Sequence, residues 1–157
     1  MKTKLYKYLK VASLSLGLCC LSACPRPMPS YCSDYYRLTN EKRIEKIKSS
    51  STEELFDLQL CNYYAEPGDF KAASAVADGG EKNIPFLLSK LYKENDGHTK
   101  EVAIFLLSVM DSNGNLPKRD EVIAVIERTI SEMKDDGFKD SASKHLQQMK
   151  EKEKTKN

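Results

Sequence analysis

Cysteines are the residues of this 157-residue chain whose type and spacing could carry chemistry. A thiolate can be acylated, can pair in a disulfide or can ligate zinc, and each fate demands a different environment. The chain contains five cysteines, at Cys19, Cys20, Cys24, Cys32 and Cys61. The two histidines, His98 and His145, do not lie at zinc-ligand spacing from any cysteine, so the sequence predicts no metal site.

The N-terminal segment is organised like an export signal. It begins with a positive region free of acidic residues, formed by Lys2, Lys4, Lys7 and Lys10. An apolar stretch over residues 11–23 follows, within the roughly 7–15 residues of a signal-peptide core. The stretch ends in Leu21-Ser22-Ala23-Cys24, which resembles the lipobox of bacterial lipoproteins. The alternatives are an ordinary secretory signal with a chance cysteine and a buried apolar helix.

The resemblance implies that residues 1–23 are removed and that the Cys24 thiol carries a diacylglycerol, with acylation of the new amino group. Each buried methylene contributes about 0.8 kcal/mol, so two or three acyl chains hold a protein on a bilayer where one alone is marginal. No apolar run reaches the roughly 18–20 residues that span a bilayer, so we expect a lipid anchor at the periplasmic face of a cell membrane. Pro25, not aspartate, follows Cys24, and the resemblance therefore favours the outer membrane.

Two cysteines, Cys32 and Cys61, remain after the signal peptide and the lipid have accounted for the other three. Disulfides persist in the compartment that this export signal implies. A bridge between these two residues would close a loop of about 30 residues and fasten the tether to the folded domain. The alternative is a pair of free thiols, one of them buried as a small apolar group. The even count favours the disulfide.

Composition and charge exclude several other functions. The charged fraction of 31% beside 40% hydrophobic residues is typical of a folded globular chain. Removal of residues 1–23 takes away four lysines and changes the formal net charge from +2 to −2, which gives no electrostatic basis for binding nucleic acid. No Walker loop, dinucleotide glycine motif, HExxH or nucleophile elbow is present, so the sequence predicts no cofactor and no catalytic residue.

Helical periodicity dominates the rest of the chain and predicts an all-α fold, a small antiparallel helical stack. We expect a signal peptide over 1–23, an extended proline-rich tether over 24–39, a helical domain over 40–150 and a charged, frayed tail over 151–157. Helices are expected at about 40–48, 51–65, 70–78, 100–111 and 120–134, with others beginning near 84 and 140. Ser51 and Glu54 have the spacing of a capping box.

The sequence also predicts which side chains are buried in the core and which are exposed. Residues 102–107 are apolar on every side, so this helix should be the buried centre of the domain, with Phe105 in the core. Ile44 and Ile47 should point inward from the first helix, whereas His98 and His145 should lie at the solvated surface.

Residues 80–114 resemble HEAT-like helical repeats. A glycine precedes Ile84-Pro85, a leucine-rich helix follows, and a polar turn then leads to an alanine-containing helix. The resemblance covers a minor part of the chain and implies stacked helix pairs. A shift of the sequence against itself gives no clean repeat, so the likeness extends only to a HEAT-like arrangement.

One segment is similar to the opening of an EF-hand calcium loop. Asp111, Asn113 and Asn115 place oxygen ligands at the first, third and fifth positions. Leu116 stands where the loop needs glycine and Val122 where it needs glutamate. These departures favour an interhelical turn over a calcium site.

Aromatic side chains supply the candidate binding surface. Tyr63, Tyr64, Phe86 and Tyr92 could point outward, where such rings favour protein interfaces. For Phe86 the alternative is packing against a neighbouring helix. These features suggest a membrane-anchored, non-enzymatic lipoprotein that binds another envelope protein. The alternatives are an immunity or inhibitor protein that neutralises a periplasmic toxin or hydrolase and, with least support, a cell-wall enzyme.

The lipobox yields the first prediction. Replacing Cys24 by alanine should abolish incorporation of radiolabelled palmitate, because the thiol is the expected acceptor of the lipid. The variant should be soluble in the periplasm, or uncleaved if processing requires the lipid. Palmitate that is still incorporated into the Cys24→Ala protein would refute the assignment.

Overall fold

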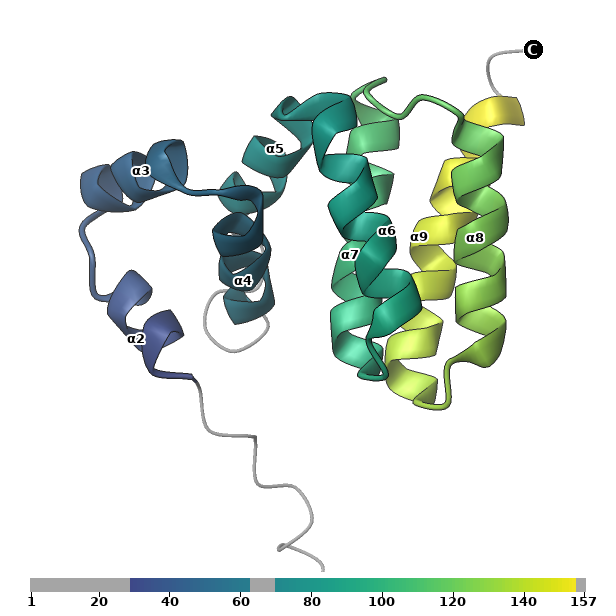
Figure 1. The fold of residues 1–157 in the computed structure, drawn as a ribbon, viewed down its shortest axis with the longest axis horizontal. Helices are drawn as coiled ribbons and strands as arrows, with labels where there is room; N and C mark the ends of the chain where they lie inside the picture. Colours follow the sequence, from purple (N-terminus) through teal and green to yellow (C-terminus); the bar gives the residue numbers. More distant parts are fainter. Residues whose placement is uncertain (1–28, 63–69, 155–157) are drawn as a thin grey trace, which may run out of the picture.

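The computed structural model describes residues 29–62 and 70–154, and every regular element in these two ranges is helical (Figure 1). The eight α-helices are α2 (Ser30–Tyr36), α3 (Asn40–Ser49), α4 (Thr52–Asn62), α5 (Lys71–Asp78), α6 (Ile84–Lys93), α7 (Gly97–Ser112), α8 (Arg119–Glu132) and α9 (Asp136–Lys154). A 3-10 turn, η1 (Gly80–Asn83), joins α5 to α6. The expected all-α stack is confirmed. Within the described ranges no helix is long and apolar enough to cross a bilayer.

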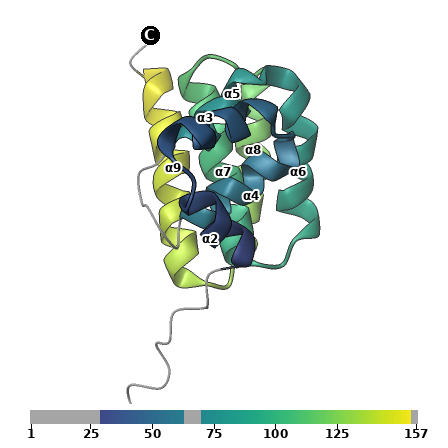
Figure 2. The same ribbon diagram turned by 90° about the vertical axis from the view of Figure 1, so that its left-hand side faces the viewer.

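Helix pairs form the architecture. The pairs α4/α5, α6/α7 and α8/α9 each pack together, and the second members α5, α7 and α9 contact one another in turn. Short turns reverse the chain between α6, α7, α8 and α9, so these four helices run antiparallel (Figure 1). Seen from the side, α2 and α3 lie in front of this bundle, over α4 and α5 (Figure 2). The arrangement is that of stacked helical hairpins.

Helix α7 is the centre of the stack, as its apolar sequence predicts. It contacts α4, α5, α6, α8 and α9, and its most extensive contact is with α9. Ile104, Leu106, Leu107 and Met110 have no solvent exposure. The expectation for Phe105 is wrong, because this side chain is only half-buried. Its ring lies between Phe70, at 5.8 Å, and His145, at 5.2 Å, on the side of α7 that faces α9 and the start of α5.

The boundaries differ from the prediction at both ends of the domain. Residues 30–36 form α2, so an extended tether over 24–39 is wrong for this part, and Cys32 and Tyr35 are buried there. At the other end, α9 continues to Lys154 and takes in the first residues of the expected charged tail. The folded domain therefore starts about ten residues earlier than the helical pattern indicates.

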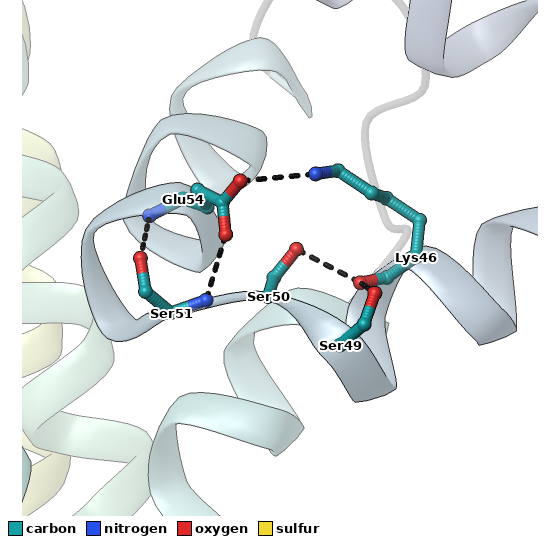
Figure 3. Close-up of polar contacts among 5 residues, drawn as sticks. All are labelled: Lys46, Ser49, Ser50, Ser51 and Glu54. Atoms are coloured by element: carbon teal, nitrogen blue, oxygen red, sulfur yellow. Dashed lines mark hydrogen bonds and ion pairs between the residues drawn. The ribbon is translucent and has the colours of Figure 1, made fainter.

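The capping box that opens α4 is present as predicted (Figure 3). The Ser51 backbone N–H donates to Glu54 Oε2 at 2.8 Å, and the Glu54 N–H donates to Ser51 Oγ at 3.2 Å. Lys46 Nζ of α3 donates to Glu54 Oε1 at 3.0 Å. The Ser51 N–H and then Lys46 hold the pKa of Glu54 below its usual 4.5. One carboxylate thus caps α4 and makes an exposed ion pair with α3.

The disulfide joins Cys32 of α2 to Cys61 of α4, with a Cα–Cα distance of 5.3 Å and no solvent exposure at either residue. This confirms the expected pairing. Helix α2 has seven residues, too few to be stable as an isolated helix in water. The covalent bond to α4 therefore holds α2 against the domain.

The disulfide yields the second prediction. The bond joins residues 29 apart, and a loop of that length contributes about 3–4 kcal/mol in the chain-entropy model. Replacing Cys32 and Cys61 together by serine should lower the unfolding free energy by about this amount in a denaturant titration. A reductant should destabilise the native protein and leave the double variant unchanged. Equal midpoints for the oxidised and reduced native protein would contradict the prediction.

Candidate functional site

A cleft of about 520 Å³ lies between α3 and α5 and is the candidate binding site. Its walls come from α3 and α5, and its floor comes from the start of α4 and from η1. The residues that line it include Ile44, Ile47, Lys48, Leu55, Lys71, Ala75, Asp78, Gly79, Lys82 and Asn83. A volume between about 300 and 1,000 Å³ is typical of binding clefts.

Polar contacts from the middle of α3 join this helix to α2 and α4. Arg43 donates from Nη2 to the Tyr36 carbonyl at 2.6 Å, and its guanidinium carbon lies 5.0 Å from the Tyr36 ring centroid. Three residues further on, Lys46 pairs with Glu54. Helix α3 also contacts α5, yet none of its side chains is fully buried. This incomplete packing of α3 on α5 leaves the cleft between the two helices.

The apolar face of α3 points to this space. Ile44 is 38% exposed and Ile47 is half-buried, and both line the cleft. The expectation that both point inward is therefore wrong for Ile44. Leu55, which is buried, and the half-buried Ala75 complete the apolar part of the lining. An exposed isoleucine beside an apolar floor is a place where a partner could remove further apolar surface from water.

A buried hydrogen-bonded amide fixes the floor. Asn83, which is buried, donates from Nδ2 to the Val76 carbonyl at 2.8 Å and accepts from Thr52 Oγ1 at 2.7 Å. These bonds tie η1 to α5 and α4. A Cβ at Gly79 would lie 2.0 Å from Asn83 Nδ2, so a residue without a side chain is required there. The floor is therefore a fixed surface.

The rim of the cleft is positively charged. Lys48, Lys71 and Lys82 line it, and Asp78 is the one acidic residue among the lining side chains. Lys48 lies in the last turn of α3, Lys71 opens α5 and Lys82 lies in η1. The excess of basic groups contrasts with the formal charge of −2 that the chain would have after removal of residues 1–23.

A second polar cluster lies between α7 and α9, around Glu101. Its Oε1 accepts from Ser141 Oγ at 2.8 Å and lies 3.3 Å from His145 Nε2, and its side chain is 15% exposed. Burial acts to raise the pKa of Glu101, but the hydrogen bonds from His145 and Ser141 and the nearby positive charge outweigh it. The pKa therefore falls below the usual 4.5. His98 also contributes to this lowering.

The positions of both histidines correct the prediction that they lie at the solvated surface. His98 is buried, and its ring stacks on Phe138 with a centroid distance of 5.1 Å. His145 has a side chain only 20% exposed and contacts both Glu101 and the Phe105 ring. Sequence reasoning missed Glu101 and Ser141, since only the packing of α7 on α9 brings these residues together.

The Glu101 cluster has the composition of a hydrolase triad but not its arrangement. In a triad the serine donates to the histidine, which a carboxylate then orients. Here Ser141 and His145 both contact the carboxylate of Glu101. Among the described residues, no group of three or more His, Cys, Asp and Glu side chains could hold a metal ion. The hydrogen bonds of this cluster join α7 to α9.

Of the four aromatic residues proposed as a binding surface, the structure describes two, Phe86 and Tyr92. Tyr63 and Tyr64 lie outside the described residues. Tyr92 is 62% exposed, as expected. Phe86 is half-buried, and its ring meets Phe56 edge to face at 5.6 Å, which is the packing alternative. Phe86 and Tyr92 are six positions apart along α6, so their side chains point about 120° away from each other around the helix axis.

The calcium-like segment is an interhelical turn. Asp111, in the last turn of α7, is buried, and its Oδ1 accepts from Arg119 Nε at 2.7 Å. Lys152 Nζ of α9 donates to the Asp111 and Ser112 carbonyls at 2.6 and 2.9 Å. A basic side chain thus hydrogen-bonds the last carbonyls of this helix. Gly114, with φ +75°, makes the reversal.

Comparison of the chain with known protein families, with curated proteins and with solved structures found no significant match.

The Glu101 cluster yields the third prediction. Because its pKa is lowered in the folded state, the stability that this carboxylate contributes is present above pH 4.5 and is lost as the pH falls through the folded pKa. Glu101→Gln should cost about 1.5–3 kcal/mol at pH 7, the range for hydrogen bonds to a charged group. The cost should shrink as the pH is lowered below 4.5.

Glu127→Gln is the matched control, since Glu127 pairs with Lys150 on the surface and its side chain is 47% exposed. It should change the unfolding free energy by less than about 0.5 kcal/mol, as surface pairs contribute little. Thermal melts of the native protein and both variants from pH 3 to 7 make the comparison. A Glu101→Gln penalty that is independent of pH would contradict the role assigned to the carboxylate.

Proposed function

We propose that this chain is a lipid-anchored envelope protein whose helical domain binds another protein, without enzymatic activity, through the cleft between α3 and α5. The observation that carries the proposal is the open cleft with exposed Ile44 on one wall and a fixed floor below. The lipobox at Leu21-Ser22-Ala23-Cys24 supports the anchor. The Cys32–Cys61 disulfide supports an oxidising compartment.

The anchor limits where the partner can be. Five residues, 25–29, separate the lipobox cysteine from the start of α2, which lies six positions after it. At about 3.3–3.6 Å per residue, a chain of that length reaches about 20 Å at most. The domain would therefore stay close to the membrane on which Cys24 is held. Its partner would be a membrane protein or a protein that works near the membrane surface.

An enzymatic function has less support from the described geometry. Glu101, His98 and His145 are buried or partly buried ionisable side chains, and their contacts link α7 to α9. The cleft lies on other helices, and its lining contains neither a histidine nor a cysteine. A nucleophile paired with a base, the minimum for covalent catalysis, is missing from these lining side chains.

Site-specific photocrosslinking gives the fourth prediction and tests the function. A benzoylphenylalanine placed at Ile44, in the lipidated protein in intact cells, should crosslink to a discrete protein, because this side chain lines the cleft and is 38% exposed. The same group at Tyr92, which is 62% exposed on α6, is the control and should give no such product.

The outcome separates the alternatives. A captured toxin or hydrolase would identify the domain as an immunity or inhibitor protein of the same binding class. The absence of a protein adduct at Ile44, or the same adduct at Ile44 and Tyr92, would contradict the proposed use of the cleft.

A further inference from the structure

We propose that the cleft between α3 and α5 receives an amphipathic helix of the partner, whose apolar face is flanked by acidic side chains. This inference rests on the proposed function and adds the chemistry of the partner. Three observations carry it: the open shape of the cleft, the apolar side chains in its lining and the lysines beside them.

The shape favours a helix over a small molecule. A pocket for a small ligand encloses most of the ligand surface. Here the walls are two separate helices, and Ile44, on the α3 wall, stays partly exposed. A groove between two helices with an apolar lining is the site used in helix-in-groove recognition, where side chains at i, i+3, i+4 and i+7 enter the groove.

The lining provides places for such side chains. Ile44 and Ile47 form one apolar wall, and the buried Leu55 lies at the floor. On the opposite wall, Ala75 and Gly79 lie one helical turn apart and present little bulk. A partner backbone can therefore approach α5 closely, and its leucine-sized side chains can reach the isoleucines of α3.

The charges select an acidic partner. Lys82 lies in η1, directly after α5. Lys48 stands on the opposite wall, in the last turn of α3. A helix lying in the cleft would therefore meet a basic group on each side. Carboxylates at those places would be attracted, whereas lysines would be repelled, and this discriminates between partners.

Binding of synthetic helices tests the inference. The protein is the mature lipidated form in nanodiscs of phosphatidylcholine, which carry no net charge. The probe is a fluorescein-labelled amphipathic peptide with leucines on one face and glutamates beside them, and its counterpart has lysine at every glutamate position. Fluorescence anisotropy should show saturable binding of the acidic peptide and at least about tenfold weaker binding of the basic one.

Variants locate the site. Ile44→Gln should weaken binding of the acidic peptide about tenfold, as loss of an apolar anchor does. Lys48→Glu combined with Lys82→Glu should weaken it to a similar degree and should strengthen binding of the basic peptide. The matched control is Lys93→Glu combined with Lys144→Glu, two exposed lysines outside the cleft lining, which should leave both affinities unchanged. Thermal melts check that all variants remain folded.

Three results would overturn the inference. They are equal affinity for the two peptides, an affinity for the acidic peptide that does not depend on Ile44, and binding to phosphatidylglycerol vesicles, lost with Lys48 and Lys82, in place of peptide binding. The proposed function is separate from these results. A protein adduct from position 44 in cells, together with failure of the acidic peptide, would leave the function standing and remove only the acidic-helix assignment.

Discussion

The covalent bond between Cys32 and Cys61 is the constraint on which the position of α2, and through it that of α3, depends. Helix α2 is too short to persist alone, yet it buries Cys32 and Tyr35, and the Tyr36 hydroxyl donates to Asn62 of α4. The Tyr36 carbonyl in turn accepts the Arg43 bond that holds the start of α3. The disulfide thus supports α2, and α2 supports α3.

The cleft follows from this chain of contacts. Helix α3 buries no side chain fully, although Ile47 packs partly against the core. Arg43 and Lys46, three residues apart in its middle, add polar contacts to α2 and α4. In the α6–α9 bundle, α7 is buried along most of its surface, and polar contacts at Glu101 and Asp111 join it to its neighbours. Helices α4 and α5 belong to the same hydrophobic core, so the disulfide and the polar contacts add to this core at α2 and α3.

Local patterns in the sequence carry much of the fold. The Ser51 and Glu54 capping box depends on residues three apart, and the all-round apolar surface of α7 requires burial wherever it packs, so both could be predicted. Because α7 has apolar residues on every face, its sequence does not show which face lies nearer to solvent. The partial exposure of Phe105 could therefore not be predicted. Helix α2 follows a run of prolines, and its stability comes from contacts with α4 that no local pattern reveals. The convergence of His98 and His145 on Glu101 and the cleft itself likewise arise from tertiary packing.

Amide hydrogen exchange before and after reduction of the disulfide tests this account most directly, because it reports stability helix by helix. If the bond between Cys32 and Cys61 supports α2 and, through it, α3, then reduction should accelerate exchange in both helices. The amides of α7 and α9, whose protection comes from the core, should change little. Unchanged exchange in α2 and α3 after reduction, or an equal loss of protection in every helix, would contradict the central role given to the disulfide.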